Sequence, residues 1–152
     1  MARPWVCCKL SSVVDEADFR RKLIKALRQR ARACEYLSSM NRAGVPDVHL
    51  VHQGRAYWLE LKYAGQWPAR GSSNVLAHRF SSPQLAFLRR VERAGGRGHG
   101  VIGFKSTSVA VIAVSDISDD GTVSRDQLEG QLTLDLSDIY FADSVLTLLA
   151  RS

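Results

Sequence analysis

The chain has 152 residues, of which 45% are hydrophobic, and a formal net charge of +6. This length suits one folded domain with a sizeable core and leaves no room for a second domain. We expect a soluble protein, because no stretch approaches the roughly 20 apolar residues that cross a bilayer and the opening MARPWVCCKLSS lacks the apolar region of a signal peptide.

Three cysteines, Cys7, Cys8 and Cys34, are an odd number and lack the spacing of a metal site. An adjacent pair such as Cys7-Cys8 is also poorly placed to form a disulfide. We interpret all three as reduced thiols, which indicates a reducing, intracellular setting and a cytoplasmic protein.

The first predicted element is an amphipathic helix from Asp15 to about Arg32, because Phe19, Leu23 and Leu27 recur at helical spacing. Asp15 and Asp18 imitate a capping box at its start. Its other faces carry a series of basic residues: Arg20, Arg21, Lys22, Lys25, Arg28 and Arg30. A short strand is expected over 34–40, followed by a turn over 41–46.

Residues 47–52 and 55–63 are strand-like, and Gln53-Gly54 between them has the length of a two-residue hairpin turn. Residues 65–81 predict a long irregular loop of the kind that can close over a substrate. Ser82-Pro83 predicts a helix start, with Ser82 as N-cap, and Gly95-Gly96 predicts its end. Strands are expected over 101–104, 109–114 and near 132–136, and a last helix toward Leu149.

The charge is unevenly distributed along this order of elements. Residues 1–115 hold 19 Lys and Arg against 7 Asp and Glu, whereas residues 116–152 hold 2 against 8. The basic part is the candidate for binding a polyanion. The element order α-β-β-β-α-β predicts a single α/β domain over 1–152, with a mixed β-sheet flanked by helices, a core over about 15–114 and an acidic C-terminal extension over 116–152.

The predicted hairpin brings three charged residues together. If the chain turns at Gln53-Gly54, then Asp47 lies directly opposite Glu60, and strand alternation places Lys62 on the same side. Two carboxylates at that separation are too close for both to ionise comfortably without a cation. Carboxylates select hard cations such as Mg²⁺ or Mn²⁺, and a neighbouring lysine can stabilise charge on a phosphate, so the chemistry indicated is phosphodiester hydrolysis.

These residues carry a resemblance. Gly44-Val45-Pro46-Asp47, followed after twelve residues by Glu60-Leu61-Lys62, resembles the signature of the PD-(D/E)xK nucleases, and SSPQLAFLRRVERAGGRGHGVIGF is similar to the VRR-NUC branch. The resemblance covers roughly 15–114. It implies a restriction-endonuclease-like fold, metal-dependent DNA cleavage, Asp47 and Glu60 as metal ligands with the Leu61 carbonyl, and Lys62 as the catalytic lysine.

The same resemblance implies an acidic residue on the first helix. Glu16 fits this role better than Asp15, because it shares a face with Phe19 and Leu23, whereas Asp15 suits the N-cap. Gln84 corresponds to the family's glutamine and shares a helical face with the apolar stripe of its helix. The long loop and the acidic extension depart from the family pattern.

Further side chains are assigned from sequence without the family pattern. We expect Arg42, Arg70, His78 and Arg79 to contact nucleic acid. His49, His52 and His99 are interpreted as surface or nucleic-acid-facing residues, and Trp58 as a residue that packs under the first helix.

The sequence therefore predicts a Mg²⁺- or Mn²⁺-dependent deoxyribonuclease, selective for DNA structure, that serves replication, repair or recombination of a bacteriophage or mobile element. Its partners would be DNA and, for cutting both strands, a second copy in a homodimer. Two alternatives stay open: a non-catalytic nucleic-acid-binding protein that kept the fold, and a phage structural or regulatory protein with the acidic extension as a docking segment. DNA structure or sequence preference, endonuclease or exonuclease action, and nicking or double-strand cutting are not readable from the sequence.

Overall fold

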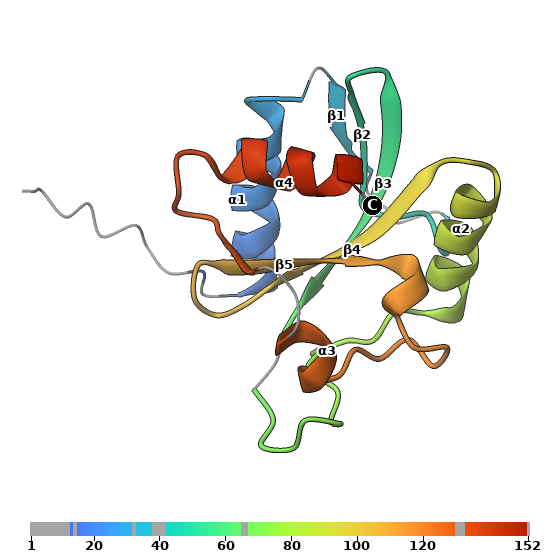
Figure 1. Cartoon of the computed structure of the whole chain (residues 1–152), viewed down its shortest axis with the longest axis vertical. Coiled ribbons are helices and arrows are strands. Elements are labelled where there is room, and N and C mark those ends of the chain that lie inside the picture. The colour runs from blue at the N-terminus through green and yellow to red at the C-terminus, as the bar shows by residue number, and fades with distance from the viewer. Residues whose placement is uncertain are drawn as a thin grey trace, which may run out of the picture.

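The computed structural model describes residues 13, 15–31, 33–37, 42–64, 67–129 and 133–151. Its elements, in chain order, are α1 (Glu16–Arg28), β1 (Ala33–Tyr36), β2 (Val48–His52), β3 (Arg55–Tyr63), α2 (Ser82–Arg93), β4 (Arg97–Gly103), β5 (Ser108–Ala113), η2 (Val114–Asp116), α3 (Arg125–Glu129), β6 (Thr133–Asp135) and α4 (Phe141–Arg151). The strands form one six-stranded sheet in the order β1 to β6. Only β3 and β4 are parallel neighbours, and α2 connects them (Figure 1).

The β2–β3 hairpin has the register that the sequence predicts. Val48 faces Leu59 and His52 faces Arg55. The turn residues Gln53 and Gly54 both have positive φ, 50° and 74°, which is the geometry of a two-residue turn matched to the twist of its strands. Extended by one pair beyond Val48–Leu59, this register places Asp47 opposite Glu60.

Helices cover both faces of the sheet (Figure 1). On one face, α1 and α4 pack over a core that includes Leu59 and Leu61 of β3. On the other face, α2 packs over a second cluster that includes Ile102 of β4. Because side chains alternate along a strand, Glu60 and Lys62 lie on the α2 face, and that face is covered rather than open.

Several predicted boundaries shift in the structure. The helix α1 ends at Arg28, with Gln29 as its C-cap. The strand expected over 34–40 is β1 at Ala33–Tyr36, and residues 38–40 lie outside the described residues. The N-cap of α2 is Ser81 rather than Ser82, since the Ser81 hydroxyl accepts the N–H of Gln84. The strand β4 begins at Arg97, four residues before its expected start, because it pairs with β3 along its whole length.

The segment 117–129 holds the loop over 67–81 in place, which the sequence did not predict. Val75 N–H donates to the carbonyl of Val123, and Phe80 N–H donates to the carbonyl of Gly121, both at 2.9 Å. The loop is therefore fixed along one side by α3 and its flanking turns.

The last part of the acidic extension joins the main fold. The strand β6 pairs with β5, and α4 contributes Val145 and Leu149 to the core under α1. The Arg30 Nε, just after the end of α1, lies 3.5 Å from Asp143 Oδ1 of α4, so the extension places an acidic residue beside the end of the basic helix. No helix among the described residues has the length and hydropathy needed to cross a membrane.

Candidate active site

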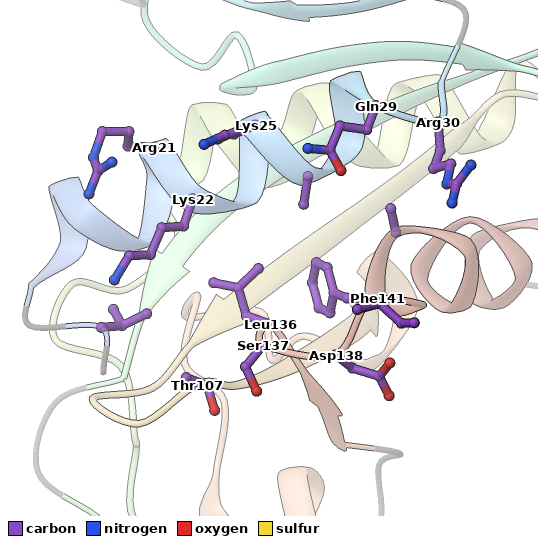
Figure 2. Close-up of a pocket in the computed structure, with 14 residues that line it drawn as sticks. Arg21, Lys22, Lys25, Gln29, Arg30, Thr107, Leu136, Ser137, Asp138 and Phe141 are labelled. Atoms are coloured by element: carbon purple, nitrogen blue, oxygen red, sulfur yellow. The ribbon is translucent and has the colours of Figure 1, made fainter. Parts of the chain in front are cut away.

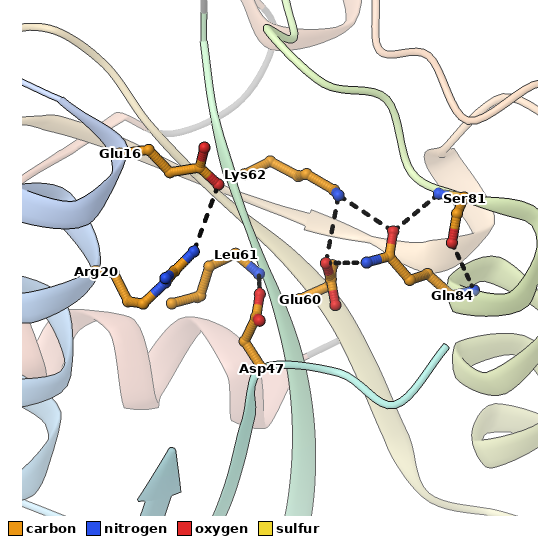
Figure 3. A network of polar contacts seen from close by, with 8 residues as sticks. All are labelled: Glu16, Arg20, Asp47, Glu60, Leu61, Lys62, Ser81 and Gln84. Atoms are coloured by element: carbon orange, nitrogen blue, oxygen red, sulfur yellow. Dashed lines mark hydrogen bonds and ion pairs between the residues drawn. The ribbon is translucent and has the colours of Figure 1, made fainter. Parts of the chain in front are cut away.

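Two charged side chains of β3 meet under the start of α2. Lys62 Nζ lies 3.3 Å from Glu60 Oε1, and the two residues are only 8% and 2% exposed. A buried charge is costly unless other groups stabilise it, so the surroundings of this pair determine its chemistry. Figure 3 shows these surroundings.

Asp47 enters the site from the loop that precedes β2. Its Oδ2 accepts a hydrogen bond of 2.9 Å from the Leu61 N–H, which ties the carboxylate to β3 between Glu60 and Lys62. The loop is fixed by Gly44, whose φ is +87° and where an added Cβ would lie 2.7 Å from Pro83. A glycine is therefore required for the loop to approach the start of α2 this closely.

Gln84 of α2 joins Glu60 to Lys62 through its amide. The Gln84 Nε2 donates to Glu60 Oε1, and Lys62 Nζ donates to Gln84 Oε1 at 3.1 Å. The same Oε1 accepts the Ser81 N–H at 2.8 Å, as part of a capping box. The cap thus orients the amide so that its donor faces the carboxylate and its acceptor faces the ammonium (Figure 3).

Both carboxylates are harder to ionise than in water. Burial, and next the charge of Asp47, raise the pKa of Glu60 to about 7 against the opposing effect of Lys62. Burial also raises the pKa of Asp47, while the Leu61 N–H and the nearby cations lower it. Perturbed carboxylates of this kind concentrate at functional sites.

The residues present fit a divalent cation. Glu60 Oε2 is buried and has no hydrogen-bond partner within the described residues, although Oε1 has two. A cation beside Asp47 and Glu60 would satisfy this oxygen and lower the pKa of both carboxylates. A cluster of three or more acidic, histidine or cysteine side chains able to hold a metal does not occur in the part of the chain that the structure describes. A site would therefore rest on two carboxylates, with main-chain and water oxygens completing the coordination.

Glu16 stands at the edge of this centre. Its Oε1 lies 3.6 Å from Arg20 of the next helical turn, and the charges of both residues influence the pKa of Asp47. Asp15 is the N-cap of α1, with its carboxylate accepting the Asp18 N–H at 2.8 Å. Of the two acids, Glu16 is thus the one whose charge raises the pKa of Asp47, whereas Asp15 caps the N-terminus of α1.

The expected nucleic-acid contacts are at the surface. Arg42, Arg70, His78 and Arg79 are all exposed. Arg42 lies in the turn before Gly44, and the other three lie in the loop over 67–81. None of the four takes part in the hydrogen bonds drawn in Figure 3, so any role would be in contacting a substrate rather than in building the centre.

Two sequence interpretations are wrong. His99 is not at the surface: it is 1% exposed, neither ring nitrogen has a partner in the described structure, and burial followed by the charge of Arg97 lowers its pKa to about 4. Trp58 packs under α2 instead of the first helix, with its ring 5.0 Å from Phe87 and 4.4 Å from His49. In both cases the face of the strand was not readable without knowing which helix covers it.

Sequence reasoning also missed two contributors to the site. Ser81 could have been found, because Ser81-x-x-Gln84 is the capping-box pattern. Phe80 carries no comparable signal: its buried ring lies 5.2 Å from Lys62 Nζ, and Gly100 of β4 leaves the room that the ring occupies. Lys62 is thus held by a carboxylate, an amide and an aromatic face.

A separate groove of about 360 Å³ lies between α1 and the segment that leads from β6 into α4. Lys22 and Lys25 face it from α1 and Gln29 from the C-cap of that helix, with Ser137 and Asp138 opposite (Figure 2). Cations outnumber acids among the charged residues of its lining, which are Arg21, Lys22, Lys25, Arg30 and Asp138. Three of these cations are already paired with carboxylates, because Arg21 and Lys22 contact Asp18 and Arg30 lies 3.5 Å from Asp143.

Comparison with known proteins identifies the fold. No family model and no curated protein matches the sequence. Among solved structures, the chain is similar to Hjc, a Holliday junction resolvase from the archaeal hyperthermophile Archaeoglobus fulgidus, with a TM-score of 0.56 and 12% sequence identity over 75% of this chain and 90% of that one. The curled mixed sheet flanked by helices is thus the restriction-endonuclease-like fold that the sequence predicted.

Proposed function

We propose that the protein is a divalent-metal-dependent DNA nuclease whose active centre consists of Asp47, Glu60 and Lys62. The observation that carries this proposal is the buried, unpartnered Oε2 of Glu60, next to a second carboxylate and a lysine. An uncompensated buried carboxylate oxygen is unfavourable, and a divalent cation is the partner that the charge of this site selects. The fold shared with a Holliday junction resolvase supports a role in DNA processing.

Asp47, Glu60 and the Leu61 carbonyl would hold the cation, which when bound supplies polarisation of the phosphate and a lowered pKa of a coordinated water. Lys62 is oriented by Glu60 and Gln84, so its ammonium can stabilise the negative charge that develops on the phosphate or orient the attacking water. Gln84 keeps the two charged groups at a fixed separation, and Glu16 adds negative charge at the edge of the site.

The substrate would be bound largely through its phosphates. The exposed Arg42, Arg70 and Arg79 supply positive charge at the surface, and the exposed His78 lies in the same loop as the last two. Further cations line the groove beside α1. We further propose one nuclease domain of the VRR-NUC type, a core over about 15–114 with an acidic extension, and a role in replication, repair or recombination of a phage or mobile element, acting as a homodimer where both strands are cut.

The test is a cleavage assay on labelled single-stranded, duplex, flap and four-way-junction DNA with Mg²⁺, Mn²⁺ or EDTA. Cleavage should require metal and should vanish in Glu60→Ala, which removes a ligand. Arg55→Ala is the matched control, because Arg55 lies at the far end of the same strand. If no DNA is cut with either metal, the nuclease proposal fails, and a non-catalytic DNA-binding role becomes the better account.

A further inference from the structure

We infer that Trp67 is a stacking platform for an unpaired base of the substrate, and that it makes the enzyme prefer DNA with an unpaired or unstacked nucleotide near the cut. This inference rests on the proposed nuclease function. It names the substrate class of that same site and a residue that selects it.

Trp67 is held in a fixed position although it is 43% exposed. The Arg125 guanidinium lies over its ring at 5.6 Å, and the Phe104 ring lies 5.9 Å away. Arg125 donates to the carbonyls of Pro68 and Ala69 at 3.0 and 3.1 Å and to Glu129 at 2.6 Å. These contacts support the ring before any ligand binds, which reduces the entropy lost on binding.

The loop behind Trp67 is hydrogen-bonded to α3. Asp126 N–H donates to the carbonyl of Gly71 at 2.9 Å, and Arg125 N–H donates to the carbonyl of Ser73 at 3.1 Å. These bonds hold the loop against α3, so that Trp67 is presented from a supported surface.

The platform lies on the same side of the sheet as the catalytic centre. Lys62 pairs with Ile102 of β4, and Phe104 follows two residues later on the same face. From strand geometry, Trp67 lies on the order of 10–15 Å from Lys62. This distance corresponds to roughly three or four nucleotides of a stacked strand at about 3.4 Å each.

The chemistry of the platform selects the class of ligand. An aromatic ring with a cation behind it stacks well on another π-system, and every nucleobase offers such a face. A base inside a continuous duplex is already stacked on both sides, so stacking it on Trp67 would first cost a few kcal/mol of unpairing and unstacking. A gap, flap or bulge offers an unpaired base without that cost.

The test compares Trp67→Leu, which keeps apolar bulk without a ring, with Trp67→Phe, which keeps a ring. Tyr140→Leu is the matched control, because Tyr140 is also an exposed aromatic residue, 62% exposed, in the turn before α4. Affinity for flap and fully paired DNA is measured by anisotropy in EDTA, so that nothing is cut. Compared with the unsubstituted protein, Trp67→Leu should bind flap DNA roughly tenfold to a hundredfold more weakly and duplex DNA nearly as well. The affinities of Trp67→Phe and Tyr140→Leu for both DNAs should stay close to those of the unsubstituted protein.

A second readout needs no substitution. 2-Aminopurine, placed at successive unpaired positions within four nucleotides of the branch, should be quenched at one position when the unsubstituted protein binds. Equal losses of Trp67→Leu on both DNAs, or no loss and no quenching, would overturn the inference. If Trp67→Leu loses flap binding while no DNA is ever cut, the platform stands and the nuclease function fails. If DNA is cut and Trp67→Leu keeps its preference, only the platform fails.

Discussion

The aromatic ring beneath Lys62 gives a prediction whose size follows from the structure. Phe80 is 1% exposed and Lys62 is 8% exposed. The centroid of the Phe80 ring lies 5.2 Å from the Lys62 Nζ. A desolvated cation–π contact is worth up to ~2 kcal/mol. If this contact holds Lys62 where it acts in the transition state, its loss should reduce kcat by roughly 5- to 30-fold.

The cleanest perturbation keeps the shape of the ring. Phe80→Leu would also open a cavity, because the Phe80 ring fills the space above Gly100. Replacement of Phe80 by 3,4,5-trifluorophenylalanine withdraws charge from the ring face at nearly constant volume. Single-turnover cleavage of labelled DNA should slow in this protein, while its melting temperature stays within a few degrees.

Phe87 supplies the matched control. The Arg90 guanidinium lies over its ring at 5.4 Å, so the same fluorination weakens a cation–π contact outside the proposed catalytic centre. Fluorination at Phe87 should leave the cleavage rate unchanged. The reasoning is refuted if the Phe80 substitution leaves kcat unchanged, or if both positions slow cleavage equally.

Three further predictions concern stability and the site. The pKa of His99 is lowered from 6.5 to about 4, so the stability that neutral His99 contributes is present above pH 6.5 and is lost as the pH falls through 4. Between pH 7 and pH 4, the free energy of unfolding of His99→Leu should therefore fall by roughly 3 kcal/mol less than that of the unsubstituted protein, as measured by urea titration. Parallel dependence of the two free energies on pH would contradict this. Gln84→Leu removes the amide that joins the two charged groups and should slow cleavage roughly 10- to 100-fold with DNA affinity little changed; a rate within twofold would exclude this role. Gly44→Ala should lower the free energy of unfolding by about 1–3 kcal/mol more than Gly54→Ala, because both glycines have positive φ but only Gly44 lies against Pro83. Similar melting temperatures for the two variants would argue against the contact between Gly44 and Pro83.

The features of the site that local spacing determines were predictable from sequence. The hairpin register follows from a two-residue turn at Gln53-Gly54, and it is confirmed from Val48–Leu59 to His52–Arg55. Strand alternation then placed Glu60 and Lys62 on one face.

Features that depend on which segments meet in space were not predictable. The burial of His99 depends on α1 and α4 covering its face of the sheet, and the place of Trp58 depends on α2 covering the other. The hydrogen bonds that fix the loop over 67–81 come from residues about fifty positions later, such as Val123 bonding to Val75. Sequence periodicity reports which side chains share a face, but it does not report the partner of that face.

The most direct test of the central claim is a paired measurement on Lys62→Ala: cleavage of labelled DNA with Mg²⁺, and equilibrium binding of the same DNA with Ca²⁺. We predict that cleavage is lost by at least roughly a hundredfold while metal-supported binding stays within a few fold, because Lys62 acts on the reacting phosphate and Asp47 and Glu60 remain to hold the cation. Cleavage that survives the substitution, or an unsubstituted protein that binds DNA without metal and never cuts it, would contradict the account.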